Sequence, residues 1–370
     1  MNTITRLIIA ILLVGSGPLS GQDPDLDDLS PELWKILNSS GIPSLAAIAI
    51  VDGEVKGAGA VGLRRNGGKK PVSINDKYHI GSCTKSMTAT LAAQLIEEKR
   101  IQWDSTVGDI LKKVSPGKAY ENATLEQLLS NRGGLPRKVP GPIWSAAWDD
   151  YKRGEKRQRE NFVKAMLQEA PMYVPGKGNE YSNAGFTVAG AMLEDATGEK
   201  WETLIKERLF QPLGMVSAGF GAPDEGGREE HPSGHTEEGK PVPSGPGDDN
   251  PSAIGPAGTV HCSLPDMAKY VRMHLLAETG SVLRDPASFE KLHSPMDEEH
   301  AYAKGWGVGE RGWAKGKTLS HTGSNTMFFF VIWIAPERKF AAIAATNIGI
   351  EKGSKPCDDA VGAMIAKYLK

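Results

Sequence analysis

Apolar and polar positions alternate most clearly near the start of the chain, in SLAAIAIVDGEVKGAGAVGLRRNGG, residues 44–68. Small and β-branched residues lie on both sides of Asp52-Gly53, and such a pair between two apolar runs is a strong signal for a hairpin turn. We therefore predict two antiparallel strands joined at this turn, preceded by a short helix around Pro31–Leu37. The second strand also contains G-x-G-x-x-G at 57–62, but LRRNGGKKP follows it and cannot open the helix that a dinucleotide site needs.

The middle of the chain has the repeat of three to four residues that is typical of amphipathic helices, interrupted by proline and glycine. This pattern predicts helices over residues 86–99, 105–113, 124–131, 157–169, 184–196, 200–209 and 265–277. Residues 221–255 are dense in glycine, proline and charge. They predict a long surface excursion, which in a compact domain is usually functional or disordered.

The end of the chain returns to strand patterns, in YAKGWGVGE, GKTLSHTG, TMFFFVIWIAP and FAAIAATN, followed by a closing helix from about Asp358 to Leu369. Strands at both chain ends with helices between them predict an α+β fold, in which one antiparallel sheet is built from the two termini and flanked by helices. A mainly helical lobe, about 86–279, would be inserted into an α/β lobe formed by about 22–85 and 280–370.

Composition narrows the function classes without choosing one. The 370 residues are 39% hydrophobic and 24% charged, as in an ordinary globular protein, and the formal charge of −2 gives no electrostatic reason to expect nucleic acid. The three cysteines, Cys83, Cys262 and Cys357, can form at most one bridge, which excludes a disulfide framework.

The first residues predict a signal peptide over 1–21. Arg6 precedes the apolar run Leu7–Val14, and small and turn-forming residues follow, up to Ser20 and Gly21. The run is too short for a permanent membrane helix, although a retained anchor is the alternative. We expect a periplasmic or secreted protein with no stable membrane span after signal removal.

Ser82 and Lys85, in YHIGSCTKSMTAT, are three positions apart at the expected start of a helix. On a helix they would share a face, with Cβ atoms about 5 to 6 Å apart. A helix cap with a solvated lysine and a nucleophile beside its base both fit. The spacing alone is weak evidence, since it recurs at Ser115 and Lys118, where Pro116 and Gly117 predict a turn.

A tyrosine motif, Y-x-N, also occurs twice. Tyr181 and Asn183 follow the turn-forming VPGKGNE and lead directly into a predicted helix, a setting that can aim a side chain at a cleft. Tyr120, in the other copy, precedes a plain amphipathic helix and is interpreted as surface packing.

A third element, His321-Thr322-Gly323, lies at the boundary of two predicted strands. Glycine at a strand edge lets a substrate backbone approach closely, and the N–H of Ser324 could bind an oxyanion if that edge is unpaired.

These segments, in order, resemble a known family. YHIGSCTKSMTA, TLEQLLSNRGGLP, PGKGNEYSNAGFTVAGAMLEDATG, LFQPLGM, GPAGTVHCSLPDMAKY, YAKGWGV and HTGSNTMFFF are together similar to serine β-lactamase-related proteins, which include class C β-lactamases, D-alanyl-D-alanine carboxypeptidases, D-aminopeptidases and esterases. The likeness runs from about Pro43 to Tyr368. It implies a β-lactamase/transpeptidase-like fold.

The resemblance also implies roles. Ser82 would be the nucleophile and Lys85, partly desolvated, its base. Tyr181 would pass a proton to the leaving group or itself act as the base, and Asn183 would bind the substrate amide or hold Lys85. The N–H groups of Ser82 and Ser324 would form the oxyanion hole, no metal or cofactor being needed.

His321, Thr322 and Gly323 would bind substrate, but His321 stands where classical β-lactamases carry lysine. A histidine is mostly neutral at pH 7, which favours a small ester or a D-amino-acid-containing substrate over a cephalosporin. We therefore predict an exported serine hydrolase that forms an acyl-enzyme on Ser82. The alternative is a penicillin-binding or sensor-like protein that is acylated but turns over poorly.

Other residues have ordinary interpretations. His231 and His235 suggest zinc, but Pro232 and Gly234 break the helix that such a pair needs, so a surface loop is favoured. Cys83 is expected to pack as a small hydrophobe, and YKRGEKRQRE, residues 151–160, to be a solvated helix start. Phe328 is a candidate for lining the cleft, and residues 136–150 and 221–255 for building the substrate pocket.

Overall fold

The computed structural model describes residues 26–114, 117–149, 154–224 and 226–370. The predicted signal peptide, 1–21, lies outside the described residues, and so does Ser115 of the second S-x-x-K. Within the described ranges, no helix combines the length and the apolar character needed to cross a bilayer.

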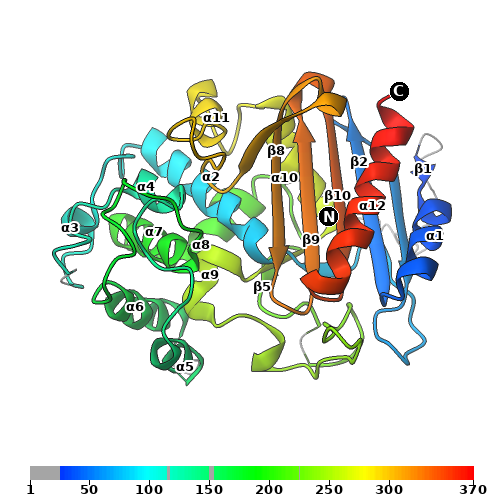
Figure 1. The fold of residues 1–370 in the computed structure, drawn as a ribbon, viewed down its shortest axis with the longest axis horizontal. Helices are drawn as coiled ribbons and strands as arrows, with labels where there is room; N and C mark the ends of the chain where they lie inside the picture. The colour runs from blue at the N-terminus through cyan, green and yellow to red at the C-terminus, as the bar shows by residue number, and fades with distance from the viewer. Residues whose placement is uncertain (1–25, 115–116, 150–153, 225) are drawn as a thin grey trace, which may run out of the picture.

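A seven-stranded sheet forms one side of the molecule (Figure 1). Its strands, in spatial order, are β1 Asp27–Asp28, β3 Glu54–Gly62, β2 Ser44–Val51, β10 Phe340–Thr346, β9 Phe329–Ala335, β8 Gly316–Ser324 and β7 Gly307–Arg311. Every neighbouring pair is antiparallel except β1 with β3. The predicted hairpin is confirmed, with Asp52 and Gly53 at φ of 53° and 84°, as a two-residue primed turn requires.

The central strands are apolar at nearly every position because both faces of the sheet are covered. Ala46, Ile48 and Ile50 of β2 belong to the main core, whereas the alternate residues Leu45 and Ala47 belong to a second core. The second core is closed by α1, Ser30–Ser40, and by α12, Ile350–Tyr368; α10, Leu264–Leu276, packs on the opposite face. A strand packed on both faces has no polar face.

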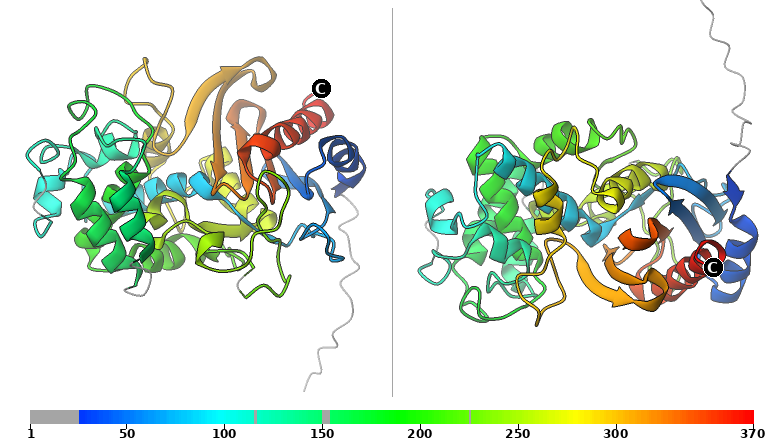
Figure 2. Two further views of the ribbon diagram at one scale, coloured as in Figure 1. Left: turned by 60° about the horizontal axis from the view of Figure 1, so that its bottom comes forward. Right: turned by 90° about the horizontal axis from the view of Figure 1, so that it is seen from above.

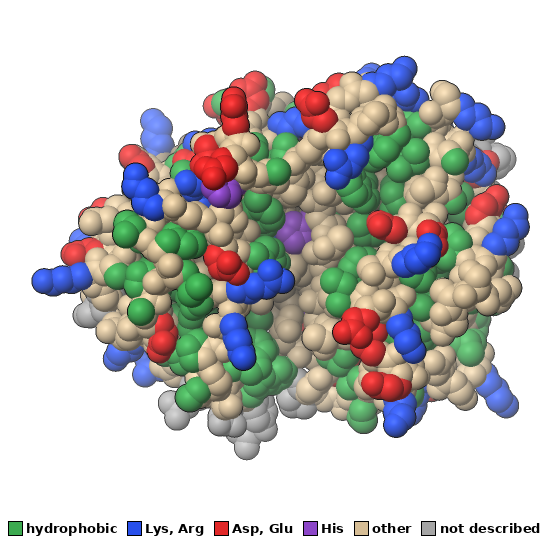
Figure 3. Space-filling view, viewed as in Figure 1, with side chains coloured by type: hydrophobic (Ala, Val, Ile, Leu, Met, Phe, Trp, Pro, Cys, Tyr) green, Lys and Arg blue, Asp and Glu red, His purple; other side chains and the backbone are tan. Residues whose placement is uncertain are grey.

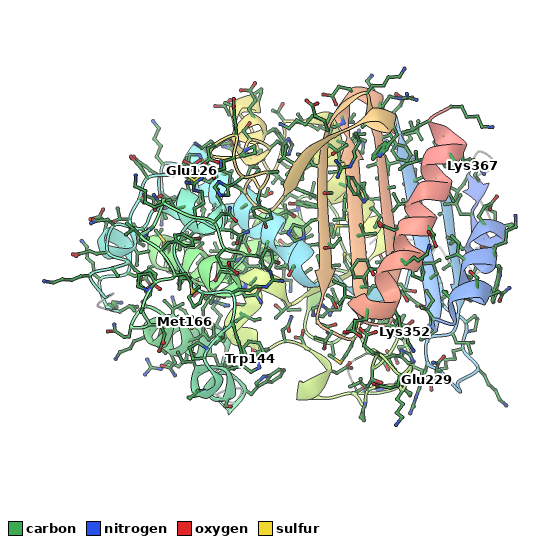
Figure 4. The ribbon with its side chains drawn as sticks, in the orientation of Figure 1. Glu126, Trp144, Met166, Glu229, Lys352 and Lys367 are labelled. Carbon is green, nitrogen blue, oxygen red and sulfur yellow. The ribbon has the colours of Figure 1, made fainter. Side chains whose placement is uncertain are left out.

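The closing helix α12 is longer than the predicted 358–369, since it begins at Ile350 and contains Pro356. Cys357, Val361 and Met364 are buried against the sheet, so tertiary packing outweighs the local cost of the proline. Lys367, near its end, lies 3.2 Å from Asp27 and links α12 to β1 (Figure 4).

The remaining helices gather beside the sheet (Figures 1 and 2). They are α2 Thr84–Glu97, α3 Val107–Ile110, α4 Leu125–Leu129, α5 Gly141–Asp149, α6 Glu155–Met166, α7 Asn183–Thr197, α8 Trp201–Ile205, α9 Gly255–Gly258 and α11 Pro286–Leu292. Helices α5, α9 and α11 were not predicted. A small sheet, β4 Lys77–His79, β6 Val260–Ser263 and β5 Gly219–Phe220, was missed as well.

Three residues of segments that were expected to face solvent are buried; of the predicted helix start at 151–160, residues 151–153 lie outside the described residues and α6 begins at Glu155. Tyr120 is fully buried, and so is Arg159, which lies 3.3 Å from Glu194 and 2.7 Å from Glu202. His235 is also buried, since its Nε2 accepts from the N–H of Asn66 and its Nδ1 contacts the carbonyl of Asn347. Arg159 and His235 contact segments distant in sequence, which local polarity does not reveal.

Asp248, in the 221–255 excursion, yields a prediction about stability. It is 1% exposed, its Oδ1 has no hydrogen-bond partner among the described residues, and burial with the nearby Asp249 raises its pKa from 3.8 to about 7. The folded state therefore binds more protons than the unfolded chain between these values, so stability falls as pH rises through this range. Asp248→Asn should stabilise the protein at pH 8 by roughly 1 to 4 kcal/mol and change little at pH 4.

Urea unfolding of both proteins at the two pH values measures this difference. An equal offset at pH 4 and pH 8 would contradict the expected titration of Asp248.

Candidate active site

Ser82 lies in a tight 3₁₀ turn, Gly81–Cys83, and not in the first turn of a helix as predicted. The α-helix α2 begins only at Thr84 and carries Lys85 in its first turn. The two side chains nevertheless meet, with Lys85 Nζ 3.1 Å from Ser82 Oγ. The 3₁₀ turn therefore differs from the predicted α-helical turn but still brings Ser82 and Lys85 into contact, as their spacing predicted.

Lys85 is completely buried and has no carboxylate partner among the described residues. Besides Ser82, its Nζ contacts Asn183 Oδ1 at 2.7 Å and the carbonyl of Ala257 in α9 at 2.8 Å. Burial without a compensating charge lowers the pKa of Lys85 to about 7. At neutral pH a large share of this amine is unprotonated and can accept a proton.

Tyr181 completes the contact around Ser82. The Tyr181 hydroxyl interacts with Ser82, and the Tyr181 ring lies 4.7 Å from Lys85 Nζ. The next residue, Ser182, caps α7 by accepting from the N–H of Gly185, which fixes Tyr181 just ahead of the helix. Burial raises the pKa of Tyr181, so its phenol is protonated at neutral pH.

The far end of β8 passes directly against the turn that carries Ser82. The pairing of β7 with β8 stops at Ser320, which leaves residues 321–324 unpaired on that side. Any side chain at 323 would collide with the carbonyl of Ile80, and one at 81 with the N–H of Ser324. Both positions therefore need glycine, and Gly81 also has a positive φ of 50°. The close approach brings the N–H groups of Ser82 and Ser324 into one region.

His321 faces this region but its ring is already engaged. Its Nδ1 lies 2.7 Å from the carbonyl of Thr322 and its Nε2 lies 3.2 Å from the hydroxyl of Tyr302. Nδ1 must donate to the carbonyl, so Nε2 accepts from the tyrosine. Burial lowers the pKa of His321 to about 3, hence the ring is neutral. Tyr302 was not singled out in the sequence, although it lies in the YAKGWGV segment.

A cavity of about 480 Å³ opens over these groups. Figure 3 shows the hollow between the helices and the sheet, with a histidine side chain at its floor. The lining residues are Ser82, Arg137, Tyr181, Tyr302, Gly307, Ser320, His321, Thr322, Gly323, Ser324, Phe329 and Ile350. Asn183 is not among them, because its side-chain oxygen is directed to Lys85.

The pocket predictions are borne out only in small part. Of residues 136–150 only Arg137 lines the cavity, and no residue of 221–255 does. Instead, that excursion forms a separate cavity of about 430 Å³ with Trp148 of α5. Phe328 is buried and does not line the cleft, where Phe329 takes the place expected for it. Cys83 packs as predicted, fully buried and unbridged.

The comparisons with known proteins agree with this geometry. A family model described as Beta-lactamase matches residues 26–362. "Penicillin-binding protein 4" of Amycolatopsis lactamdurans is 27% identical over 322 residues, covering 84% of this chain and 82% of that protein. "Unguisins hydrolase ungD" of Aspergillus violaceofuscus (strain CBS 115571) is 25% identical over 371 residues and 90% of this chain, which spans 63% of the fungal protein.

The fold has close counterparts among solved structures. The D-alanine carboxypeptidase AmpC from Burkholderia cenocepacia superposes with a TM-score of 0.71 at 19% identity, over 90% of this chain and 97% of that one. At this identity the likeness establishes the α+β fold predicted above.

Proposed function

This chain belongs to the Beta-lactamase family, and from that membership we propose that it is an exported serine hydrolase that cleaves a small ester or amide through an acyl-enzyme on Ser82. The observation that carries the proposal is the 3.1 Å contact between Ser82 Oγ and the buried amine of Lys85. A serine hydroxyl is a weak nucleophile unless a base takes its proton, and an amine with a pKa of about 7 is suited to that task at neutral pH.

Each proton transfer during acylation can be assigned to a named residue. Neutral Lys85 takes the Ser82 proton as Oγ attacks the substrate carbonyl, and the N–H groups of Ser82 and Ser324 bind the resulting oxyanion. When the tetrahedral intermediate collapses, Tyr181 gives its proton to the leaving group and regains one from the Lys85 ammonium. Water then releases the acyl group through the same groups in reverse. The raised pKa of Tyr181 supports its role as a proton donor and Lys85 as the base.

The proposed substrate class follows from the lack of a positively charged side chain on the β8 side of the cleft. His321 is neutral, so the part of β8 that lines the cleft offers no permanent positive charge to a substrate carboxylate. This absence supports an ester or a D-amino-acid amide over a cephalosporin. The name of the bacterial relative, a penicillin-binding protein, favours the second candidate: a protein that is acylated at Ser82 but deacylates slowly.

One experiment separates these candidates. The protein is incubated with a chromogenic short-chain ester, a chromogenic cephalosporin and a D-alanyl peptide, and intact masses are then recorded. Turnover supports the hydrolase, whereas a persistent adduct without turnover supports the slow-turnover alternative. Silence in all assays, including a fluorophosphonate probe, would refute both.

Arg137 is the one cation among the described residues that line the cleft, and it should give an anionic substrate a small advantage that His321 does not supply. Its guanidinium lies 5.9 Å from the centre of the Tyr181 ring, and it has no ion-pair partner among the described residues. Arg137→Gln should lower kcat/KM for a carboxylate-bearing substrate about 3- to 10-fold more than for its neutral methyl ester. Steady-state kinetics with this substrate pair measures the effect.

Lys138→Gln is the matched control, because Lys138 is an exposed neighbouring cation that does not line the cavity. If Arg137→Gln changed kcat/KM equally for both substrates, the guanidinium would not distinguish charged from neutral substrates.

We also propose export and the two-lobe division. The apolar run Leu7–Val14 behind Arg6 supports a signal peptide over 1–21, and intact-mass analysis after expression in a bacterial host would refute it if residues 1–20 remained. The lobes would meet at the Ser82 cleft, with an α/β lobe of about 22–85 and 280–370. This boundary assigns α10 to the helical lobe, although α10 packs on the large sheet.

A further inference from the structure

A buried histidine supports the turn that carries Ser82. His79, at the end of β4, is fully buried, and its Nδ1 accepts a hydrogen bond from the N–H of Gly81 at 3.0 Å. Its Nε2 lies 2.6 Å from Oδ1 of Asp249. Because Nδ1 is an acceptor, the ring proton lies on Nε2 and is donated to the carboxylate. The two bonds fix both the tautomer and the orientation of the ring.

Asp249 reaches this histidine from a distant part of the chain, the 221–255 excursion. Its neighbour Asn250 donates to the carbonyl of Gly258 at 2.7 Å, and Gly258 in turn packs against Gly81. Consecutive residues of the excursion therefore support Gly81 by two routes, one through His79 and one through Gly258. The Asp249 carboxylate also lines the cavity of about 430 Å³ beside Trp148.

Gly81 is the position at which such support matters most. Its positive φ of 50° places it against the N–H of Ser324, and Ser82 follows directly. A small rotation of the Gly81 peptide would change the separation between the N–H groups of Ser82 and Ser324. An oxyanion hole needs both donors at about 2.7 to 3.1 Å from one oxygen position, so this separation sets how well the transition state is bound.

We propose that Asp249 and His79 are positioning residues that hold the oxyanion hole in its working geometry and make catalysis depend on the 221–255 excursion. This inference rests on the proposed function, since it assigns the pair a role in acyl transfer. Neither side chain lines the cleft over Ser82, so the pair acts through Gly81 and not on the substrate.

Asp249→Ala tests the proposal, with kcat and KM measured on an accepted chromogenic substrate and Ki measured for phenylboronic acid, which forms a tetrahedral adduct with an active-site serine. We expect kcat to fall about 10- to 100-fold and the boronic acid Ki to rise by a similar factor, with KM within about threefold of wild type. Asp249→Asn keeps an acceptor for His79 and should recover kcat to within about fivefold. If the wild type is acylated without turnover, the acylation rate constant replaces kcat.

Asp248→Ala is the matched control, because it makes the same substitution one residue away on a side chain without a bond to His79. If Asp249→Ala keeps the kcat and Ki of this control, or raises KM with kcat unchanged, the proposal is overturned. If Asp249→Ala does not fold, as judged by circular dichroism, His79→Asn carries the test with the same expected fall in kcat and rise in Ki. Wild-type silence toward every substrate and probe would instead refute the proposed function.

Discussion

Replacing Ser82 with alanine is expected to abolish turnover of every accepted substrate, with kcat falling by about four to six orders of magnitude. Ser82 Oγ is the atom that would form and break the acyl bond, and among the described residues it is the hydroxyl in contact with Lys85 Nζ. Initial rates with the chromogenic substrates measure the loss. Intact masses should at the same time show that the variant no longer reacts with a fluorophosphonate.

Ser115→Ala provides the matched control, since Ser115 belongs to the second S-x-x-K of the chain and is expected to be dispensable. The folded state of both variants is compared by thermal unfolding. Retention of more than about 1% of the wild-type rate in Ser82→Ala, or an adduct that remains after the substitution, would move the nucleophile to another residue.

Part of the candidate site was predictable from sequence because it is local. The Ser82 and Lys85 pair needs only one turn of chain. The hairpin at Asp52-Gly53 is equally local, because a primed two-residue turn demands positive φ at both positions. Sequence patterns that span only a few residues largely determine their own local geometry. Tyr181, in contrast, reaches Lys85 from a segment distant in sequence, and only the family resemblance indicated that the two would meet.

The residues that sequence reasoning missed act across long separations. Tyr302 meets His321 only because β8 returns past the segment before β7, and Asp249 meets His79 only because the 221–255 excursion folds back on β4. Arg159 was misjudged for the same reason, since its buried partners Glu194 and Glu202 lie on other helices. A run of charged residues predicts exposure to solvent, and only the structure shows that one of them pairs with a distant carboxylate.

The unpaired end of β8, residues 321–324, was predicted from sequence only in part. The sequence predicts glycine at a strand edge but not what approaches it. The structure places the Ser82 turn there, so tightly that residue 323 cannot carry a side chain. Close approach of two backbones is thus the physical reason for Gly323, whereas the sequence alone suggested room for a substrate.

Lys85→Met should reduce kcat/KM by at least about three orders of magnitude while leaving the protein folded and at least as stable as wild type. Methionine fills a similar volume but cannot accept the Ser82 proton. Burial lowers the Lys85 pKa from 10.5 to about 7, so the unfolded chain binds more protons between these values. The stability cost of Lys85 is therefore full below pH 7 and disappears as pH rises above 10.5, and the substitution removes it.

The same lowered pKa predicts the pH dependence of the proposed activity of the wild-type protein. Below pH 7 Lys85 is protonated and cannot act as a base, so kcat/KM should fall about tenfold per pH unit on the acid side of an inflection near 7. Lys304→Met is the contrasting control, because Lys304 is also buried but lies 2.9 Å from Glu126. That variant should lose stability, since an ion-pair partner of a half-buried carboxylate is removed, and should keep the inflection near 7. An inflection unmoved from wild type in any residual activity of Lys85→Met would assign the titration, and with it the base, to a different group.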